Sequence, residues 1–533
     1  MLQRMPDAVQ PLLLLRSMLV LLLPCLANAQ GGVQAGAAPQ PAVIPVDRDA
    51  DQRGAPVKEM TLEEALMRGR GWNVGIKEAQ VLPEQARLDV LFAEAGFHPE
   101  FYGAAGFAET ERPQFNQFQP SITSQTIDAQ VGWRQRVITG GLFDLAFQPS
   151  RFESDGGGGF FPSKQYTANW QASFRQPLLR GAWWDYGMGD INSARFRMTQ
   201  ANFDFDRTVQ DTLLQIVQAY WELVFARENW RVVNSAFAVS EEQLRITLER
   251  IRVEQLAPRD RVADEAEVAR RREELITAEN AIGDREDDLR RLLYDGSDEQ
   301  IWRYNIRPIS PMAVTPASEL PGFEALVDVA VQNRPDLRAV RSSVSAAEVA
   351  AMQAERDVLP QLDLISSYSS DGVSSDQVDG SGVFTAGSFN QAFRDASQRQ
   401  FPDWSVRLEF AIPLGNHAAR SRSRRANLEV ERQRRRLHGA TLDAQKEVRE
   451  ALRRIRTLGQ SIRATEESVR LAETNLETEQ VKQRVGASTA FEVQRRNQEL
   501  REARGRLLRN QLDHRIAESR LLYVQGLLDA EPK

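Results

Sequence analysis

The sequence predicts a mainly α-helical chain with a smaller β part, built as two tandem copies of one plan. Two long stretches, about 190–294 and about 420–528, carry apolar residues at alternating spacings of three and four, a pattern typical of amphipathic, coiled-coil-like helices. Before each stretch, at about 99–178 and about 360–414, apolar and polar residues alternate, which is typical of strands with one apolar face. Related motifs also recur in the same order in both halves.

The composition of the 533 residues restricts the class of protein. The mean hydropathy is -0.45, and beyond the N-terminus no segment approaches the roughly 20 apolar residues of a spanning helix, which excludes a polytopic helical membrane protein. A net charge of -7 gives no basic surface for nucleic acid. One cysteine and four scattered histidines predict neither a disulfide framework nor a metal site. No catalytic or phosphate-binding motif occurs, so we expect no enzyme, no catalytic residues and no cofactor.

The first 29 residues have the pattern of a secretory signal peptide. A basic start and a short apolar run lead to Ala27-Asn28-Ala29, and we expect cleavage after Ala29. The alternative makes Cys25 a lipid acceptor, but lipoprotein signals require a small residue before the cysteine, where this chain has Pro24. Residues 30–57, rich in Gly, Ala, Pro and Gln, are predicted to be a flexible leader.

The two copies are related by motifs at nearly constant offsets. Glu63 and Glu324, and likewise Pro99 and Pro360, are 261 residues apart, and the offset shrinks to 232 between Asp260 and Glu492. A longer insertion within the first copy explains this shrinkage. We therefore expect a first repeat at 58–294, a proline-rich linker at 295–321, a second repeat at 322–528 and a tail at 529–533.

The predicted strands are suited to lipid only as part of a closed barrel, because an open edge leaves backbone groups unpaired in hydrocarbon. Two strand regions per copy give about four strands, or six if segments 131–137 and 142–147 form an extra hairpin around Gly140-Gly141; bacterial barrels need about eight or more, so this reading requires oligomerisation. The alternative is an ordinary β-sandwich core. Five tryptophans are candidates for a membrane-interface belt: Trp133, Trp170, Trp183, Trp184 and Trp404.

The sequence resembles the TolC-like outer-membrane efflux proteins over nearly all of the predicted mature chain. The resemblance lies in segments 62–66 (LEEAL) and 330–337 (AVQNRPDL), in the strand ends 176–181 (QPLLRG) and 412–415 (IPLG), and in the helix breaks 257–260 (APRD) and 484–488 (RVGAS). It implies a homotrimer in which each chain gives four strands to a twelve-stranded barrel in the outer membrane of a Gram-negative bacterium. The helices would then form a periplasmic tunnel that docks to a periplasmic adaptor protein and an inner-membrane transporter. The implied function is a passive duct for drugs, metals or secreted proteins; the sequence does not identify the cargo.

The resemblance makes the helix breaks the periplasmic tips, where the tunnel narrows and the adaptor docks. Asp260 and Glu492 stand at matching places, and a trimer would gather six such carboxylates near the entrance, with Arg495 close to them. The alternative role of Glu492 is structural, because Thr489-Ala-Phe-Glu492 forms a capping box. The helix-break and docking candidates are Arg252, Val253, Ala257, Pro258, Arg484, Val485, Gly486, Ala487 and Ser488.

This chain departs from the family pattern at the tips. Glu254 stands where the family has glycine, whereas the second copy keeps Gly486, the residue expected to allow a left-handed turn. Arg495 replaces a second acidic residue, so the family latch is not expected here. The competing hypothesis is a coiled-coil periplasmic adaptor or interaction protein, which would show one helical hairpin between lipoyl-like halves.

Overall fold

The structure is a computed structural model that describes residues 56–113, 121–155, 163–296, 302, 304–311, 321–378, 384–485 and 487–529, with only the backbone at 260 and 490. All of these residues belong to one compact unit, 53–533. The expected signal peptide, including Cys25, Ala27 and Ala29, lies outside the described residues, as do most of the leader and Gly486. No helix within the described ranges combines the length and the apolar character needed to cross a membrane.

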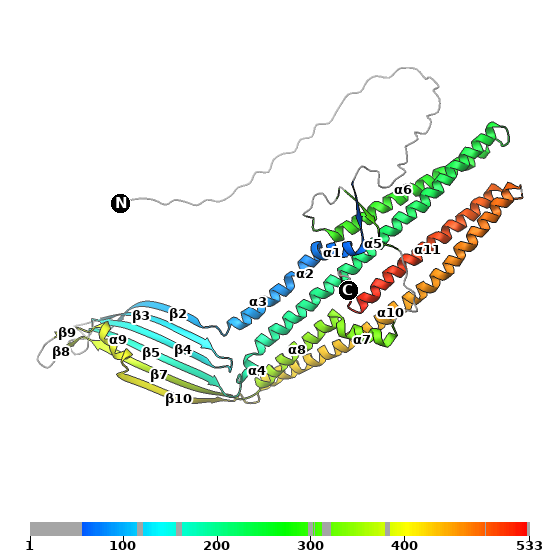
Figure 1. The fold of residues 1–533 in the computed structure, drawn as a ribbon. Coiled ribbons are helices and arrows are strands. Elements are labelled where there is room, and N and C mark those ends of the chain that lie inside the picture. The colour runs from blue at the N-terminus through cyan, green and yellow to red at the C-terminus, as the bar shows by residue number, and fades with distance from the viewer. Residues whose placement is uncertain are drawn as a thin grey trace, which may run out of the picture. The chain divides into compact units, whose positions relative to one another are not determined.

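Helices dominate the described residues, as predicted, and four of them are long (Figure 1). The strong 3–4 periodicity becomes α5 (Gly189–Arg252), α6 (Asp260–Leu293), α10 (His417–Arg484) and α11 (Ala490–Val524). α5 packs along α6, and α10 along α11, as two helical hairpins. Shorter helices lie beside them: α1 (Leu62–Trp72), α2 (Val74–Ala79), α3 (Val81–Ala95), α4 (Trp184–Gly187), α7 (Phe323–Asn333) and α8 (Pro335–Arg356).

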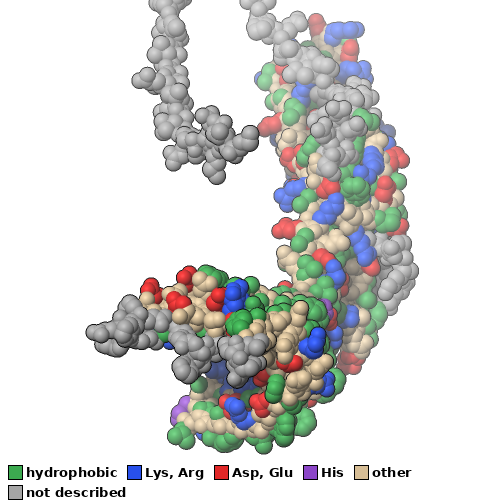
Figure 2. Space-filling model, turned by 90° about the vertical axis from the view of Figure 1, so that its left-hand side faces the viewer, with side chains coloured by type: hydrophobic (Ala, Val, Ile, Leu, Met, Phe, Trp, Pro, Cys, Tyr) green, Lys and Arg blue, Asp and Glu red, His purple; other side chains and the backbone are tan. Residues whose placement is uncertain are grey.

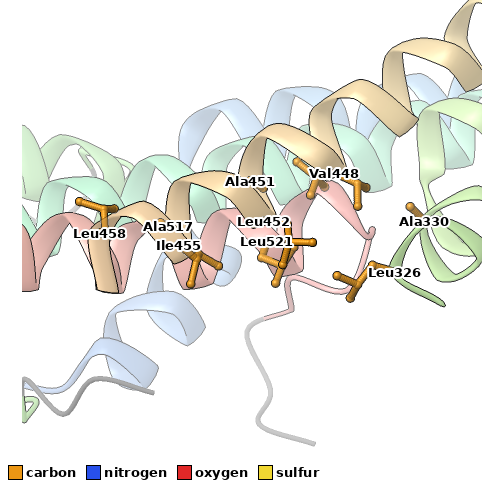
Figure 3. Packing of buried hydrophobic residues seen from close by; sticks show 10 residues of the cluster. Leu326, Ala330, Val448, Ala451, Leu452, Ile455, Leu458, Ala517 and Leu521 are labelled. Atoms are coloured by element: carbon orange, nitrogen blue, oxygen red, sulfur yellow. The ribbon is translucent and has the colours of Figure 1, made fainter. Parts of the chain in front are cut away.

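A buried apolar cluster joins α7 to the second hairpin. Val448, Leu452 and Ile455 repeat along one side of α10, and they pack against Leu521 of α11 and Leu326 of α7 (Figure 3). Burying a Leu, Ile or Val side chain contributes roughly 1.5–3 kcal/mol, so this cluster stabilises the packing of α7 against α10 and α11. The outer surfaces of the helices carry charges of both signs, scattered among polar groups (Figure 2).

Two side chains at the start of the first copy, Thr61 and Asn73, cap the first two helices. The Thr61 side chain accepts a hydrogen bond from the Glu64 amide at 3.1 Å, and Asn73 caps α2 through the Ile76 amide at 3.1 Å. The Asn73 side-chain amide also donates to the Leu292 carbonyl at 2.8 Å, which ties α2 to the end of α6.

A short parallel strand pair between the start of the chain and the linker is not predicted by the sequence. β1 (Val57–Met60) pairs with β6 (Asn305–Pro308), so ordered structure begins inside the expected leader and recurs in the linker. Tyr220 of α5 donates to the Met60 carbonyl at 3.0 Å and contacts Ser310, which anchors this pair on the first hairpin.

The main sheet of the described residues has six antiparallel strands in the order β10-β7-β5-β4-β3-β2 (Figure 1). Their bounds are β2 Glu100–Pro113, β3 Ser121–Arg136, β4 Leu142–Ser154, β5 Lys164–Pro177, β7 Gln361–Ser375 and β10 Phe401–Ala411. The extra hairpin is confirmed as β3 and β4, whose turn contains Gly140 at φ +86. The sheet thus has six strands, the larger of the two numbers that the sequence left open, where the resemblance implies four per chain. The physical reason is that β3 and β4 alternate as strands do and pair with each other from Leu142 to Phe147 and from Ser150 to Ser154.

A small helix that lies on the sheet is also not predicted by the sequence. α9 (Phe389–Ser397) follows the two-residue strands β8 (Gln377–Val378) and β9 (Phe384–Thr385), and it lies against β5 and β7 (Figure 1). β7 extends to Ser375, into a segment whose Ser, Gly and Asp content indicates a loop.

Candidate membrane-facing sheet and helix tips

One face of the sheet is apolar across every described strand. One row of residues, each paired with the next across the ladder, runs over this face from edge to edge. Every second residue along each strand lies on the same face, because the register of each strand pair stays constant along its length. The residues of this row are Trp404, Tyr368, Ala172, Leu145, Trp133 and Phe101.

The apolar face is exposed rather than packed against a second layer over most of its area. On β10, Trp404 is 72% exposed and Leu408 is 64% exposed, while Phe101 on β2 is 80% exposed. Contiguous apolar patches larger than a few hundred Å² mark surfaces that meet a membrane or a partner. The β-sandwich alternative is wrong, because no second sheet among the described residues covers this face.

The opposite face is polar and linked by charges across the strands. Arg175 of β5 forms ion pairs with Asp363 of β7 at 2.9 Å and with Glu409 of β10 at 3.2 Å. At the other edge, Tyr102 donates to the Asp144 carboxylate at 3.0 Å. A sheet with one apolar and one charged face fits a boundary between lipid and water.

Three of the five predicted interface tryptophans lie on the apolar face. These are Trp133, Trp170 and Trp404, and the first two have aromatic neighbours on β4, Phe143 at 5.4 Å and Phe147 at 4.6 Å between ring centroids. Trp183 and Trp184 instead follow β5, at the start of the helices, and are 58% and 62% exposed. The structure therefore separates the five into a strand group and a group at the sheet–helix junction.

α9 covers a part of the apolar face where small polar residues replace large apolar ones. Ser370, Gly372 and Ser374 of β7 share that face. The Ser370 hydroxyl donates to the Ala396 carbonyl at 2.7 Å, and the Ser388 amide donates to the Ser374 hydroxyl at 3.0 Å. A Cβ at Gly372 would lie 1.9 Å from the Ala392 carbonyl oxygen, so glycine is required for this close approach. The helix thus satisfies hydroxyls that would otherwise face outward.

The first helical tip turns through a left-handed residue. The Gln255 amide donates to the Arg250 carbonyl at 2.8 Å and the Glu254 amide to the Ile251 carbonyl at 3.0 Å, the pair of bonds that closes a Schellman motif. Glu254, at φ +61, occupies the position that usually requires glycine. Arg252 and Val253 end α5, and Ala257 and Pro258 precede α6.

We predict that Glu254→Gly stabilises the first tip. A left-handed conformation costs a residue with a Cβ roughly 1–2 kcal/mol, and glycine removes most of that cost although it adds some unfolded-state entropy. We expect a net gain of about 0.5–1 kcal/mol in the free energy of unfolding, measured by urea denaturation. Glu265→Gly in the second turn of α6 is the matched control and should lose about 1 kcal/mol. A loss at both positions would contradict the left-handed assignment.

The second tip repeats the same hydrogen bond. The Ala487 amide donates to the Lys482 carbonyl at 2.8 Å, so α10 ends with Arg484 and Val485 as α5 ends with Arg252 and Val253. The Ser488 hydroxyl donates to Glu479. That hydrogen bond, together with Lys482, lowers the pKa of the Glu479 carboxyl. The hydrogen bonds of Ala487 and Ser488 hold the turn against the end of α10.

The Thr489 side chain caps α11 through the backbone amide of Glu492, which is one of the two hydrogen bonds of the predicted capping box. The Glu492 amide donates to the Thr489 hydroxyl at 3.3 Å. The Glu492 carboxylate forms an ion pair with Arg495 of the same helix at 3.2 Å. Of Asp260, the structure describes only the backbone, at the first position of α6. Asp260 is thus the first residue of α6 and Glu492 the third of α11, so both belong to the first turn of the helix that follows a break.

A groove of about 740 Å³ lies between the two hairpins near the tips, and the sequence gives no signal for it. Arg484 and Arg495 line it together with Arg271 and Arg501. Burial, reinforced by the nearby charge of Arg271, lowers the pKa of Arg501. The groove could not be predicted because its sides come from helices about 230 residues apart. Within the described ranges, no group of three His, Cys, Asp or Glu side chains is placed to hold a metal ion.

Comparisons with known proteins agree with the resemblance. Residues 326–526 match the family model described as outer membrane efflux protein. No curated protein matches the chain in sequence. Three solved structures are similar: the CmeC outer membrane channel of Campylobacter jejuni, VceC of Vibrio cholerae, and the open state of the MtrE outer membrane channel of Neisseria gonorrhoeae.

These similarities extend over most of the chain at low sequence identity. For CmeC the TM-score is 0.60 at 14% identity, covering 88% of this chain and 86% of the other. For VceC the values are 0.61 and 14%, with 87% and 96% covered. For MtrE they are 0.59 and 15%, with 88% and 91% covered. The resemblance to TolC-like outer-membrane efflux proteins is thereby confirmed, by the family model for the second half and by the fold for the described chain.

Proposed function

We propose that the chain is the outer-membrane exit duct of a tripartite efflux or type I secretion system in a Gram-negative bacterium. It acts as a passive channel without catalysis or a cofactor. One observation carries the proposal: a sheet with an exposed apolar face and a charged face continues directly into two very long helical hairpins. The family match of residues 326–526 supports the same reading.

The two faces of the sheet support a position in the membrane. Its apolar face would meet outer-membrane lipid, while Arg175, Asp363 and Glu409 would line a water-filled interior. The described strands of one chain are too few for a barrel, since bacterial barrels need about eight or more. Closure therefore requires further copies, and we propose a homotrimer.

The length of the two helical hairpins supports a tunnel. α5 has 64 residues and α10 has 68, so each spans about 100 Å at 1.5 Å per residue. Such helices have no role in a small globule, but three pairs of hairpins would enclose a duct across an aqueous compartment. Their tips would dock a periplasmic adaptor protein, with an inner-membrane transporter as the source of energy.

The element order supports the proposed tandem repeats. In each half, short helices precede strands, and the strands precede a long helical hairpin. We place the first repeat at 58–294 and the second at 322–528, with the hairpin of β3 and β4 as the insertion that lengthens the first. The signal peptide at 1–29, the leader, the linker at 295–321 and the tail at 529–533 complete the domain proposal.

Membrane fractionation tests the duct against the periplasmic adaptor alternative. We expect the protein in the outer-membrane fraction, resistant to carbonate extraction, as a trimer whose migration in gels changes on heating. An adaptor would have one helical hairpin, whereas the described residues contain two. A soluble periplasmic monomer would overturn the proposal.

We predict that replacing both Asp260 and Glu492 with alanine shifts ion selectivity toward anions. In a trimer the double variant removes six carboxylates near the entrance, including the one that pairs with Arg495 at 3.2 Å, which makes the tips more positive. The reversal potential in planar bilayers under a KCl gradient measures this shift. Thr489→Ala is the matched control, because it removes the α11 cap and keeps every charge. Equal reversal potentials in all variants would leave Glu492 only its role in capping.

A further inference from the structure

We infer that three copies of the chain close one barrel of eighteen strands, six from each copy, rather than the twelve that the family resemblance implies. The outer opening of the channel would then be wider than in a twelve-stranded relative. The inference rests on the proposed function, which supplies the trimer and the membrane position. It depends on whether β3 and β4 belong to the barrel wall.

β3 and β4 are integral to the sheet. β4 pairs with β5 from Leu142 to Glu153, and with β3 from Leu142 to Phe147 and again from Ser150 to Ser154; its Ala146 is only 2% exposed. β2, in turn, pairs with β3 over its whole length, from Glu100 to Pro113. A twelve-stranded barrel would have to break the β2–β3 and β4–β5 ladders and pair β2 with β5 instead.

The side chains of β3 and β4 are also those of a lipid-facing wall. Val131 and Trp133 on β3, and Leu145 and Phe147 on β4, continue the apolar face without a gap. Val131 is 62% exposed in the single chain. Outside the barrel wall, this hairpin would present an apolar face to water, which is unfavourable by about 25 cal/mol per Å².

The two free edges are suited to each other. β2 runs away from the helical end and β10 returns to it, so β10 of one copy and β2 of the next would pair antiparallel, as all other neighbours do. Neither edge has a partner strand among the described residues. Closure in a ring would satisfy the backbone groups of both edges, which lipid cannot do.

The stagger of the strands in the sheet corresponds to the strand tilt of a closed barrel. In the row from Phe101 to Trp404, Phe101 is one residue from the helical end of β2, and Trp404 is seven residues from the helical end of β10. Six residues of stagger over five steps, at about 3.3 Å per residue and 4.8 Å per strand, give a tilt of about 40°. Closed barrels have tilts of about 35–45°.

Strand number sets the size of the opening. With strands about 4.8 Å apart and tilted about 40°, eighteen strands give a backbone diameter of roughly 36 Å, against roughly 24 Å for twelve. Conductance does not test this, because the tips would limit the current.

Cysteine accessibility tests the inference in the trimer reconstituted into lipid nanodiscs. The chain has no cysteine beyond residue 25, so single cysteines report unambiguously. Val131→Cys on the apolar face and Gln130→Cys on the polar face of β3 are compared using a charged, membrane-impermeant maleimide. We expect Gln130→Cys to react at least tenfold faster. Leu408→Cys on β10 is the reference, because it would face lipid in a barrel of either size.

The possible results distinguish the number of strands in the barrel from the proposed function as a duct. Protection of both Val131→Cys and Leu408→Cys supports eighteen strands. A reactive Val131→Cys beside a protected Leu408→Cys places the hairpin outside the wall and overturns the inference, while the duct itself stands. If Leu408→Cys reacts as fast as Gln130→Cys, the apolar face does not meet lipid, and the proposed function fails as well.

Discussion

Replacing Arg334 with alanine is expected to lower the free energy of unfolding by about 2–3 kcal/mol, because it removes a buried guanidinium together with its charge-assisted hydrogen bonds to two partly exposed carboxylates. Arg334 is only 4% exposed and forms ion pairs with Asp336 at 2.7 Å and with Glu447 of α10 at 2.6 Å. The same guanidinium reaches the Val524 carbonyl at the end of α11. One side chain thus joins α8 to both helices of the second hairpin.

Arg435→Ala is the matched control for this variant. Arg435 is another arginine that pairs with a carboxylate, Glu431, but its side chain is 80% exposed, so its loss should change stability by no more than about 0.5 kcal/mol. Urea denaturation followed by circular dichroism at 222 nm measures both variants. Similar midpoints for the two would contradict the structural role of the Arg334 cluster.

The same cluster predicts a loss of stability in acid. Burial alone would raise the pKa of Asp336, but its hydrogen bonds with Arg334 and the charges of Arg334 and Arg207 lower it below the ordinary value. A carboxyl whose pKa is lowered by folding stabilises the protein above its unfolded pKa of about 4, and this contribution is lost as the pH falls below that value. Asp336→Asn should flatten the decline between about pH 4 and pH 2. An unchanged acid profile would show that other carboxylates control it.

Replacing Leu408 with arginine is expected to be the most damaging change on the sheet. Leu408 lies on the apolar face of β10 and is 64% exposed, so in water the substitution would cost little. Facing lipid near the middle of the membrane, an arginine costs about 2–4 kcal/mol. We expect a strong reduction of folded trimer in the outer membrane, measured by the fraction whose gel migration changes on heating.

Ser405→Arg supplies the control on the same strand. Ser405 lies on the polar face, where its hydroxyl contacts that of Ser367 at 2.8 Å. An arginine there would face the water-filled interior and should leave the yield of trimer nearly unchanged. Equal yields for the two arginine variants would show that the apolar face does not meet lipid.

The parts of the fold that were predicted from sequence are those whose signal is local. β10 alternates cleanly from Trp404 to Phe410 because one face is apolar along its length. The ends of α5 and α10 were located from the breaks near Pro258 and Gly486. β7 loses its alternation at Ser370 and Gly372 because α9 covers that stretch, so the strand end and the helix that covers it were both missed.

The remaining features depend on contacts between distant segments. β1 and β6 are four residues each and about 245 residues apart, so neither has a pattern of its own. In the candidate site, the cap at Thr489 was predicted because its partner is three residues away. The groove containing Arg271 and Arg501 arises only when the hairpins lie side by side.

Single-particle imaging of the protein purified from outer membranes in detergent tests the central claim most directly. The proposed duct predicts a threefold-symmetric particle with a detergent belt around a β-barrel and a hollow helical tube extending from it. A particle without threefold symmetry, or one with no detergent belt around the sheet, would contradict the assignment as a trimeric outer-membrane channel.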